Sequence, residues 1–126
     1  MSGLFGFVSG SVIVPVVFVI FGLILWKAAP PINDFFGYRS KRSRQSALAW
    51  GFAQKTAGRL MVIIGAPMII VSLAAGLFAE KRLDTDGKFW ALMIIIALQT
   101  AVMGYVNYRV ECKLKATFDE NGQPRE

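Results

Sequence analysis

Three long stretches of the chain contain no charged residue, and this constrains the fold more than any other feature. They run from Leu4 to Trp26, from Leu60 to Ala79 and from Phe89 to Tyr108, with 23, 20 and 20 residues. All 14 Lys and Arg and all 8 Asp and Glu lie outside them. A helix that crosses a bilayer core needs about 20 mainly apolar residues. We therefore predict an all-α integral membrane protein, with three transmembrane helices forming one module over residues 1–126.

The composition argues against most catalytic and metal-binding functions. The chain has no histidine, and Cys112 is its single cysteine. A zinc, haem or iron–sulfur site within one chain and a Ser-His-Asp triad are therefore not expected. The three stretches also lack the ionisable side chain that ion-coupled transporters usually place near the middle of the membrane. We expect no catalytic, cofactor-binding or metal-binding residue, and predict that the protein is not an enzyme.

Small and polar residues inside the stretches indicate how the helices pack. Gly6 and Gly10 form a GxxxG pattern, which allows another helix to approach closely. Gln99 stands out as a strongly polar side chain in the third stretch. It could form a hydrogen bond between helices or line a ligand path, and we favour the hydrogen bond. Pro15 and Pro67 are expected to kink the first two helices.

The charges between the stretches predict the orientation. Residues 27–59 carry seven basic side chains and one acidic one, residues 80–88 carry three of each, and residues 109–126 carry four of each. Basic residues accumulate on the cytoplasmic side of membrane proteins. We therefore place the loop 27–59 and the tail 109–126 in the cytoplasm, and the N-terminus outside. The basic loop is expected to contact an anionic inner leaflet, without direct nucleic-acid binding.

The loop 27–59 is predicted to contain a short amphipathic cytoplasmic helix of about three turns. Ser46 is a plausible N-cap, and Trp50 is predicted to anchor this helix at the lipid headgroups. Gly58 either marks the junction with the second membrane helix or lies within one continuous helix. One side of this helix is predicted to contain Leu48, Ala49, Phe52, Ala53 and Thr56, with Trp50 elsewhere on the helical wheel.

The tail after Tyr108 has two interpretations. Apolar residues recur at four-residue spacing from Val106 to Phe118, which is typical of a helix. Val110, Cys112 and Leu114 also alternate with polar residues, as in a strand. We favour the helix, with an end at residues 121–122.

Spaced residues in the loop resemble the signature of a known family. Asn33 is followed by Phe36-Gly37-Tyr38-Arg39-Ser40, and a tryptophan follows the arginine by eleven residues. This pattern resembles that of the SdpI family, in which some members have a histidine where Gln54 stands here. The matching positions are Asn33, Phe36, Gly37, Arg39, Ser40, Ser46, Trp50 and Gly58.

The resemblance implies a function. The name-giving members are bacterial membrane proteins that confer immunity to a secreted, membrane-active killing peptide. It implies a protein of the bacterial cytoplasmic membrane that gives immunity to, or senses, such a toxin by non-enzymatic intramembrane recognition. A cytosolic regulator would be a further partner if the protein signals. The alternative is an accessory subunit of a larger membrane complex; a lipid-binding or small-solute carrier is weaker.

Four loop residues suggest physical roles. Asn33 is expected to cap or bridge helix ends, and Gly37 to supply a positive φ at a tight reversal. Arg39 is expected to bind a lipid phosphate or a group of backbone carbonyls through its planar guanidinium. Trp50 would fix the surface helix against the headgroups. The competing interpretation is that all four residues only shape the loop.

Overall fold

The protein is all-helical. The computed structural model describes residues 2–33 and 35–125, with side chains for 10–33 and 35–125. The helices are α1 (Ser2–Lys27), α2 (Ala47–Arg82) and α3 (Thr85–Thr117). Over the described ranges there is no strand, only an isolated bridge between Phe118 and Pro124. Each helix contains a segment long and apolar enough to cross a membrane, so the predicted membrane fold is confirmed.

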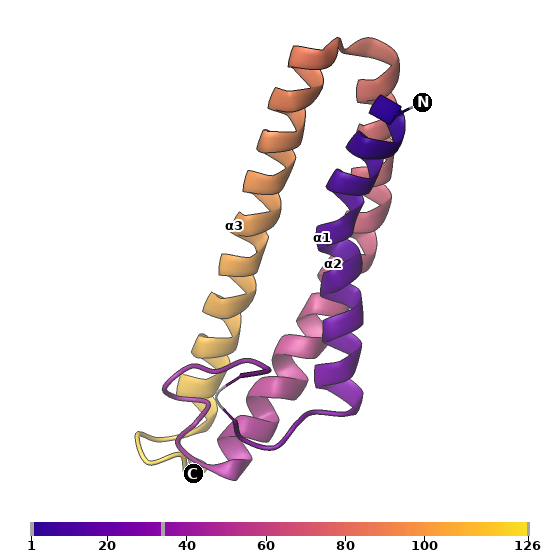
Figure 1. Ribbon diagram of the computed structural model, residues 1–126. Coiled ribbons are helices and arrows are strands. Elements are labelled where there is room, and N and C mark those ends of the chain that lie inside the picture. Colours follow the sequence, from indigo (N-terminus) through magenta and orange to yellow (C-terminus); the bar gives the residue numbers. More distant parts are fainter. Residues whose placement is uncertain (1, 34, 126) are drawn as a thin grey trace.

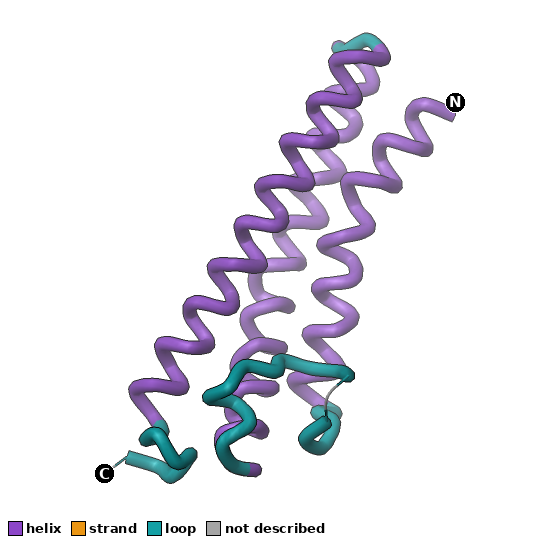
Figure 2. Tube along the Cα trace, turned by 60° about the vertical axis from the view of Figure 1, so that its left-hand side comes forward, coloured by secondary structure: helices purple, strands orange, loops and turns teal. Residues whose placement is uncertain are grey.

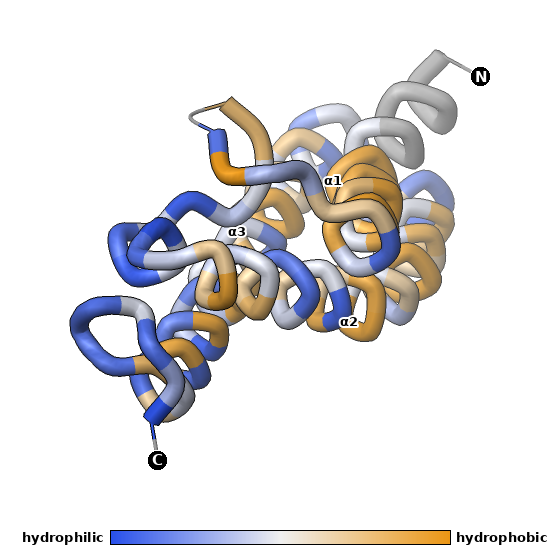
Figure 3. Tube along the Cα trace, turned by 90° about the horizontal axis from the view of Figure 1, so that it is seen from below, coloured by the Kyte–Doolittle hydropathy of each residue, from blue (hydrophilic) through white to orange (hydrophobic). Residues whose placement is uncertain are grey.

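The two ends of the helix bundle differ (Figure 1). The N-terminus and the short α2–α3 connection lie at one end, which we call the turn end. The loop 28–46 and the C-terminal tail lie at the other, the loop end, where the loop folds back across the helices (Figure 2). Seen from the loop end, this loop and the tail are mainly hydrophilic, whereas α1 behind them is mainly hydrophobic (Figure 3).

The described loop contains no separate surface helix, and the alternative of one continuous helix is confirmed. Residues 47–59 form the first turns of α2, which continues without a break to Arg82. Ser46 is the N-cap, as predicted, because its side-chain oxygen accepts the backbone N–H of Ala49. Gly58 lies inside the continuous helix, where its small size serves packing and does not end the helix. Helices α1 and α2 also continue through Pro15 and Pro67.

Helices α1 and α2 touch through glycine. A Cβ atom added to Gly58 would lie 2.5 Å from the carbonyl oxygen of Gly22, and one added to Gly22 would lie 2.8 Å from the carbonyl oxygen of Gly58. Gly65 extends the contact, since its added Cβ would lie 3.2 Å from the Cβ of Phe18. We call this contact the glycine seam. It makes α1 and α2 the closely packed pair, and α3 has fewer contacts with both.

The predicted GxxxG pattern has a different partner. A Cβ added to Gly10 would lie 3.4 Å from Cδ1 of Leu92, so this glycine faces α3. The contacts of Gly6 lie outside the described residues. The close α1–α2 packing therefore uses glycines other than the predicted Gly10.

Helix α3 continues beyond the third charge-free stretch. It ends at Thr117, before the predicted position, and the Phe118 N–H donates to the carbonyl of Leu114. The helical interpretation of the tail is thus confirmed as far as Thr117. Gly122 then adopts a positive φ of 78° in the turn that follows. At the loop end, α2 and α3 share a buried core of Ala49, Ala53, Ala57, Val106, Val110, Leu114 and Phe118.

Candidate functional site

Asn33 organises the start of the loop. Its Oδ1 accepts the backbone N–H groups of Phe35 at 2.8 Å and Phe36 at 2.7 Å. Its Nδ2 donates to the carbonyl of Pro31 at 2.8 Å. These bonds stabilise a turn within the loop. The predicted role in capping or bridging helix ends is therefore replaced by a local one.

Gly37 and Gln54 hold the loop against α2. Gly37 has a φ of +108°, as predicted, and an added Cβ would lie 2.7 Å from Oε1 of Gln54. Gln54 is fully buried. Its Oε1 accepts the backbone N–H of Tyr38 at 2.8 Å, and its Nε2 donates to the Tyr38 carbonyl at 2.7 Å. One amide thus pairs with both backbone groups of a loop residue, which fixes the position of the loop.

Trp50 is a buried support of the loop. Its side chain is 3% exposed, and Nε1 donates to the carbonyl of Pro30 at 2.7 Å. The predicted anchoring at lipid headgroups is wrong, because Trp50 lies one turn before Gln54 on the face that the loop covers. Leu48, predicted to share one side of the helix with Ala49 and Ala53, is 62% exposed, whereas those two alanines are buried.

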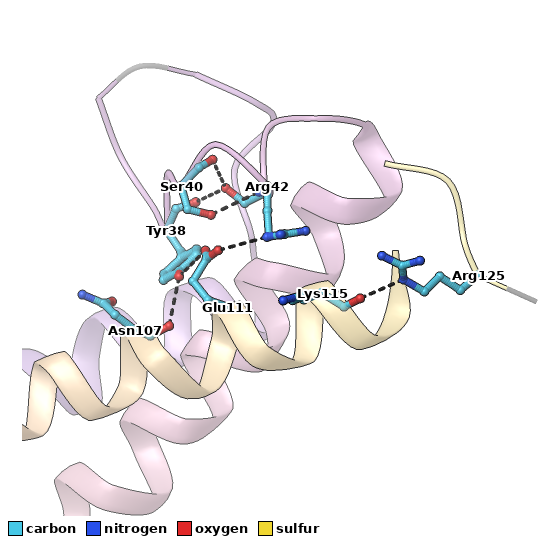
Figure 4. Close-up of polar contacts among 8 residues, drawn as sticks. Tyr38, Ser40, Arg42, Asn107, Glu111, Lys115 and Arg125 are labelled. Atoms are coloured by element: carbon cyan, nitrogen blue, oxygen red, sulfur yellow. Dashed lines mark hydrogen bonds and ion pairs between the residues drawn. The ribbon is translucent and has the colours of Figure 1, made fainter. Parts of the chain in front are cut away.

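Tyr38 connects the loop to α3 (Figure 4). Its Oη donates to Oε1 of Glu111 at 2.6 Å and lies 3.2 Å from the Asn107 carbonyl oxygen. Oε2 of the same carboxylate lies 3.9 Å from Nε of Arg42. Burial and the hydrogen bond to Glu111 raise the pKa of Tyr38 well above its ordinary value. The phenol is therefore neutral at pH 7 and remains a hydrogen-bond donor.

Two serines form the next turn. Ser43 is fully buried, and its Oγ donates to the Ser40 carbonyl at 2.8 Å. The Ser43 backbone N–H donates to Oγ of Ser40 at 3.1 Å. Arg39, between Tyr38 and this turn, is exposed. The motif serine at position 40 therefore shapes the turn that follows Arg39.

A groove of about 820 Å³ lies between α1, α3 and the loop; we call it the loop groove. Apolar side chains of α1, including Val17 and Phe21, form one wall. Met103 of α3 contributes to the opposite wall. The polar lining residues are Tyr38, Arg39, Ser40, Asn107 and Glu111. The groove can therefore accept an amphipathic molecule, with apolar parts along the helices and polar parts near the loop.

The motif residues fall into two groups. Phe36, Gly37, Arg39 and Ser40 line the loop groove. Asn33, Ser46, Trp50 and Gly58 hold the loop and helices in position. Ser46 has a second role, since its Oγ also donates to the Gly122 carbonyl at 2.6 Å and so holds the tail.

Gln99 lies far from this motif and links all three helices. Its Nε2 donates to the Ser11 carbonyl of α1 at 2.8 Å and to Oγ of Ser72 of α2 at 3.0 Å. The favoured interhelical hydrogen bond is confirmed. Gln99 also lines a separate groove between α2 and α3.

Three contributors to the site are not evident from the sequence alone: Gln54, which the family resemblance marks only as a departure from the pattern, Tyr38 and Glu111. The available signal for Glu111 was its position as the first acidic residue after the third apolar stretch. Within the described part of the chain, no three His, Cys, Asp or Glu residues are grouped to hold a metal ion.

The fold and the loop groove define a multi-pass membrane protein whose first loop is built against α2 and α3. The model of the SdpI/YfhL protein family matches residues 30–106, which contain the loop, all of α2 and most of α3. The chain therefore belongs to the SdpI/YfhL family. No curated protein and no solved structure compared with the chain matches it.

Proposed function

We propose that this protein recognises a membrane-active peptide within the bilayer, and so gives immunity to the peptide or senses it, without catalysing a reaction. Family membership supports the proposal. The observation that carries it is the loop groove, with helical apolar walls and a polar end. Its α1 wall includes Ile13 and Val17, which are 59% and 42% exposed. A peptide already dissolved in the membrane can therefore reach the groove sideways.

The groove suits an amphipathic helix. Such a helix places its apolar face in a hydrophobic groove and its polar residues at the rim. Here the rim offers both signs of charge, Arg39 from the loop and Glu111 from α3. A cationic group of the peptide would compete with Tyr38 and Arg42 for the Glu111 carboxylate. Binding would then loosen the loop from α3, which provides a route for sensing.

The proposal includes a location and an orientation. We place the protein in the bacterial cytoplasmic membrane with the loop end in the cytoplasm, because residues 27–59 carry seven basic side chains and one acidic one. The basic loop would contact the anionic inner leaflet. Loosening of the loop would present this surface to a cytosolic regulator.

A killing assay tests the proposal. A sensitive bacterial strain expressing the protein is challenged with a panel of purified secreted peptides that permeabilise bacterial membranes. We expect protection against at least one peptide, and we expect Val17→Trp and Met103→Trp to remove it by filling the groove. Ile70→Trp is the control, because Ile70 is 71% exposed and lies outside both grooves. Equal protection by all variants at equal membrane abundance would contradict recognition in the loop groove.

The second candidate is an accessory subunit of a membrane complex. It is favoured by the limited contact of α3 with the other helices and by exposed apolar side chains such as Ile94 and Leu98. Purification in mild detergent separates the candidates. A larger membrane protein recovered in fixed stoichiometry, without protection in the killing assay, would support the accessory role.

A further inference from the structure

The apolar wall of the loop groove is about as long as one membrane leaflet is thick. Its lining residues on α1 run from Ile13 to Leu25, which lie about 18 Å apart along the helix axis. One leaflet contributes roughly 15 Å, half of the hydrocarbon core. Ile13, Val17 and Phe21 are 59%, 42% and 38% exposed, so lipid chains reach this wall from the side. An acyl chain along α1 would therefore extend from the headgroup level to the middle of the bilayer.

The polar end of the loop groove lies at headgroup level. Glu111 is the first acidic residue after the third apolar stretch, about 4.5 Å beyond Tyr108 along α3. Lipid headgroups occupy the zone directly outside the hydrocarbon core. Arg39 of the loop lines the same end of the groove. Side chains of both charges thus meet the groove at the depth where a phospholipid carries its own charges.

Glu111 has room for a further cationic partner. Tyr38 donates to Oε1 at 2.6 Å, whereas Nε of Arg42 lies 3.9 Å from Oε2, beyond hydrogen-bond distance (Figure 4). The Glu111 side chain is 36% exposed and lines the groove, so an ammonium group in the groove can reach it. A primary ammonium group has three N–H donors in a compact shape. It can therefore bond to Oε2 while Tyr38 keeps its bond to Oε1.

We propose that the loop groove binds one phospholipid with a primary-amine headgroup, such as phosphatidylethanolamine, whose ammonium group donates to Glu111 and whose phosphate faces Arg39. One acyl chain lies along the α1 wall. Charge complementarity favours this lipid over phosphatidylglycerol, which has a phosphate but no cation and would place a second negative charge near Glu111. A peptide that enters the groove must displace the lipid. The inference does not depend on such a peptide, because lipid binding and protection against killing are measured separately.

Native mass spectrometry of the full-length protein tests the proposal. The purified protein is titrated in detergent micelles with phosphatidylethanolamine, phosphatidylcholine or phosphatidylglycerol of identical acyl chains, which gives the Kd of the first lipid bound. We expect phosphatidylethanolamine to bind about fivefold more tightly than phosphatidylglycerol, the upper end for a partly exposed ion pair. Phosphatidylcholine should also bind more weakly than phosphatidylethanolamine, because its quaternary ammonium group has no N–H to donate.

Two variants assign the preference to the groove. Glu111→Gln should lose it, since the amide still accepts from Tyr38 but has no charge. Glu120→Gln is the matched control, because it removes the same charge from an exposed position of the tail outside the groove. Val17→Trp should weaken binding of all three lipids by filling the groove, with Ile70→Trp as its control. If Glu111→Gln does not fold, Val17→Trp and the three lipids on the unmodified protein decide the result.

Four outcomes would overturn the proposal. The first is binding of phosphatidylglycerol to the unmodified protein as tight as that of phosphatidylethanolamine. The second is a preference that Glu111→Gln retains, or that Glu120→Gln loses to the same extent. The third is unchanged lipid binding by Val17→Trp. The fourth is a dimer that carries no lipid and that Val17→Trp dissociates, which would make the groove a contact between copies of this chain.

Discussion

The α1–α2 pair and α3 are held in opposite ways. At the glycine seam, a Cβ on Gly58 would lie 2.5 Å from a carbonyl oxygen of α1, whereas a Cβ on Gly104 of α3 would meet nothing within 4 Å. Apolar side chains gain little by leaving lipid for another helix, so close packing in a membrane depends on small residues. The α1–α2 pair has such a seam along its contact. Helix α3 instead meets α2 in the apolar core at the loop end and is bonded at polar points there and at mid-membrane, and both grooves lie beside it.

The α1–α2 pair and helix α3 therefore have different structural roles. The glycine seam provides a rigid support, and the Gln54 amide fixes the loop on that support. Helix α3 is connected through Gln99 at mid-membrane and through Glu111 at the loop end. We therefore expect a ligand that competes for these polar groups to shift α3 without opening the seam.

Gly58→Ala should lower the free energy of unfolding more than the other substitutions, because Gly58 lies in the α1–α2 contact. The added methyl group would press on the backbone of α1, and overpacking of this kind costs about 3 kcal/mol at the upper end of its usual range. Gly51→Ala is the control in the same helix, because an added Cβ there meets nothing within 4 Å. Unfolding of the purified proteins in increasing SDS gives both free energies. Equal stability of the two variants would show that the seam is not the tight contact.

Gln54→Leu should release the loop while leaving the seam intact. The variant leaves the Tyr38 backbone N–H without its partner and removes the shorter of the two bonds to the Tyr38 carbonyl, which still accepts from Ser43 Oγ at 3.3 Å, at a cost of about 2 kcal/mol. Hydrogen exchange at the loop amides should become faster, while exchange within α1 should not change. Lys55→Ala, at the exposed neighbouring position, is the control. Slow exchange at Tyr38 in Gln54→Leu would indicate that other contacts hold the loop.

Gln99→Leu should weaken the attachment of α3 only modestly. The variant removes the bonds to Ser11 and Ser72, and side-chain hydrogen bonds between membrane helices contribute about 0.6 kcal/mol on average. The loss in the same SDS titration should be clearly smaller than for Gly58→Ala. A larger loss would make Gln99, and not the seam, the main determinant of helix association. Thr100→Ala is the control, since Thr100 bonds to its own helix.

Tyr38 should give an effect that is visible only at high pH. Its folded-state pKa is raised above the unfolded value of about 10, so its contribution to stability is complete below about pH 10. That contribution is lost as the pH rises through the folded-state pKa, because the phenolate cannot donate to Glu111. Absorbance titration at 295 nm of the wild type, minus that of Tyr38→Phe, isolates this phenol. Ionisation near pH 10 in the folded protein would disprove the contact with Glu111.

Local signals in the sequence were sufficient for some residues. Ser46 precedes a helical pattern and is its N-cap, and Gly37 lies in a turn and has a positive φ. Gln99 is a polar group in an apolar stretch and therefore requires a hydrogen-bond partner; it bonds to two other helices. In each case the chemistry of one residue and its neighbours dictates the outcome.

Other features depended on which elements meet. The exposed face of the first turns of α2 contains Leu48, and the buried face contains Trp50 and Gln54. Only the path of the loop over this face decides that assignment. Likewise, Tyr38 and Glu111 are 73 residues apart in the chain, and no local pattern indicates that they are bonded.

The sequence by itself determined that this chain forms three membrane helices, since a backbone in lipid must pair its polar groups within each helix. The sequence also contains the loop signature that indicates the SdpI/YfhL family. Only the tertiary structure decided which helix faces meet, where the glycine seam lies and where the two grooves open. The physical reason is that these helices are apolar on all sides, so hydrophobic patterning does not distinguish a face toward lipid from a face toward protein.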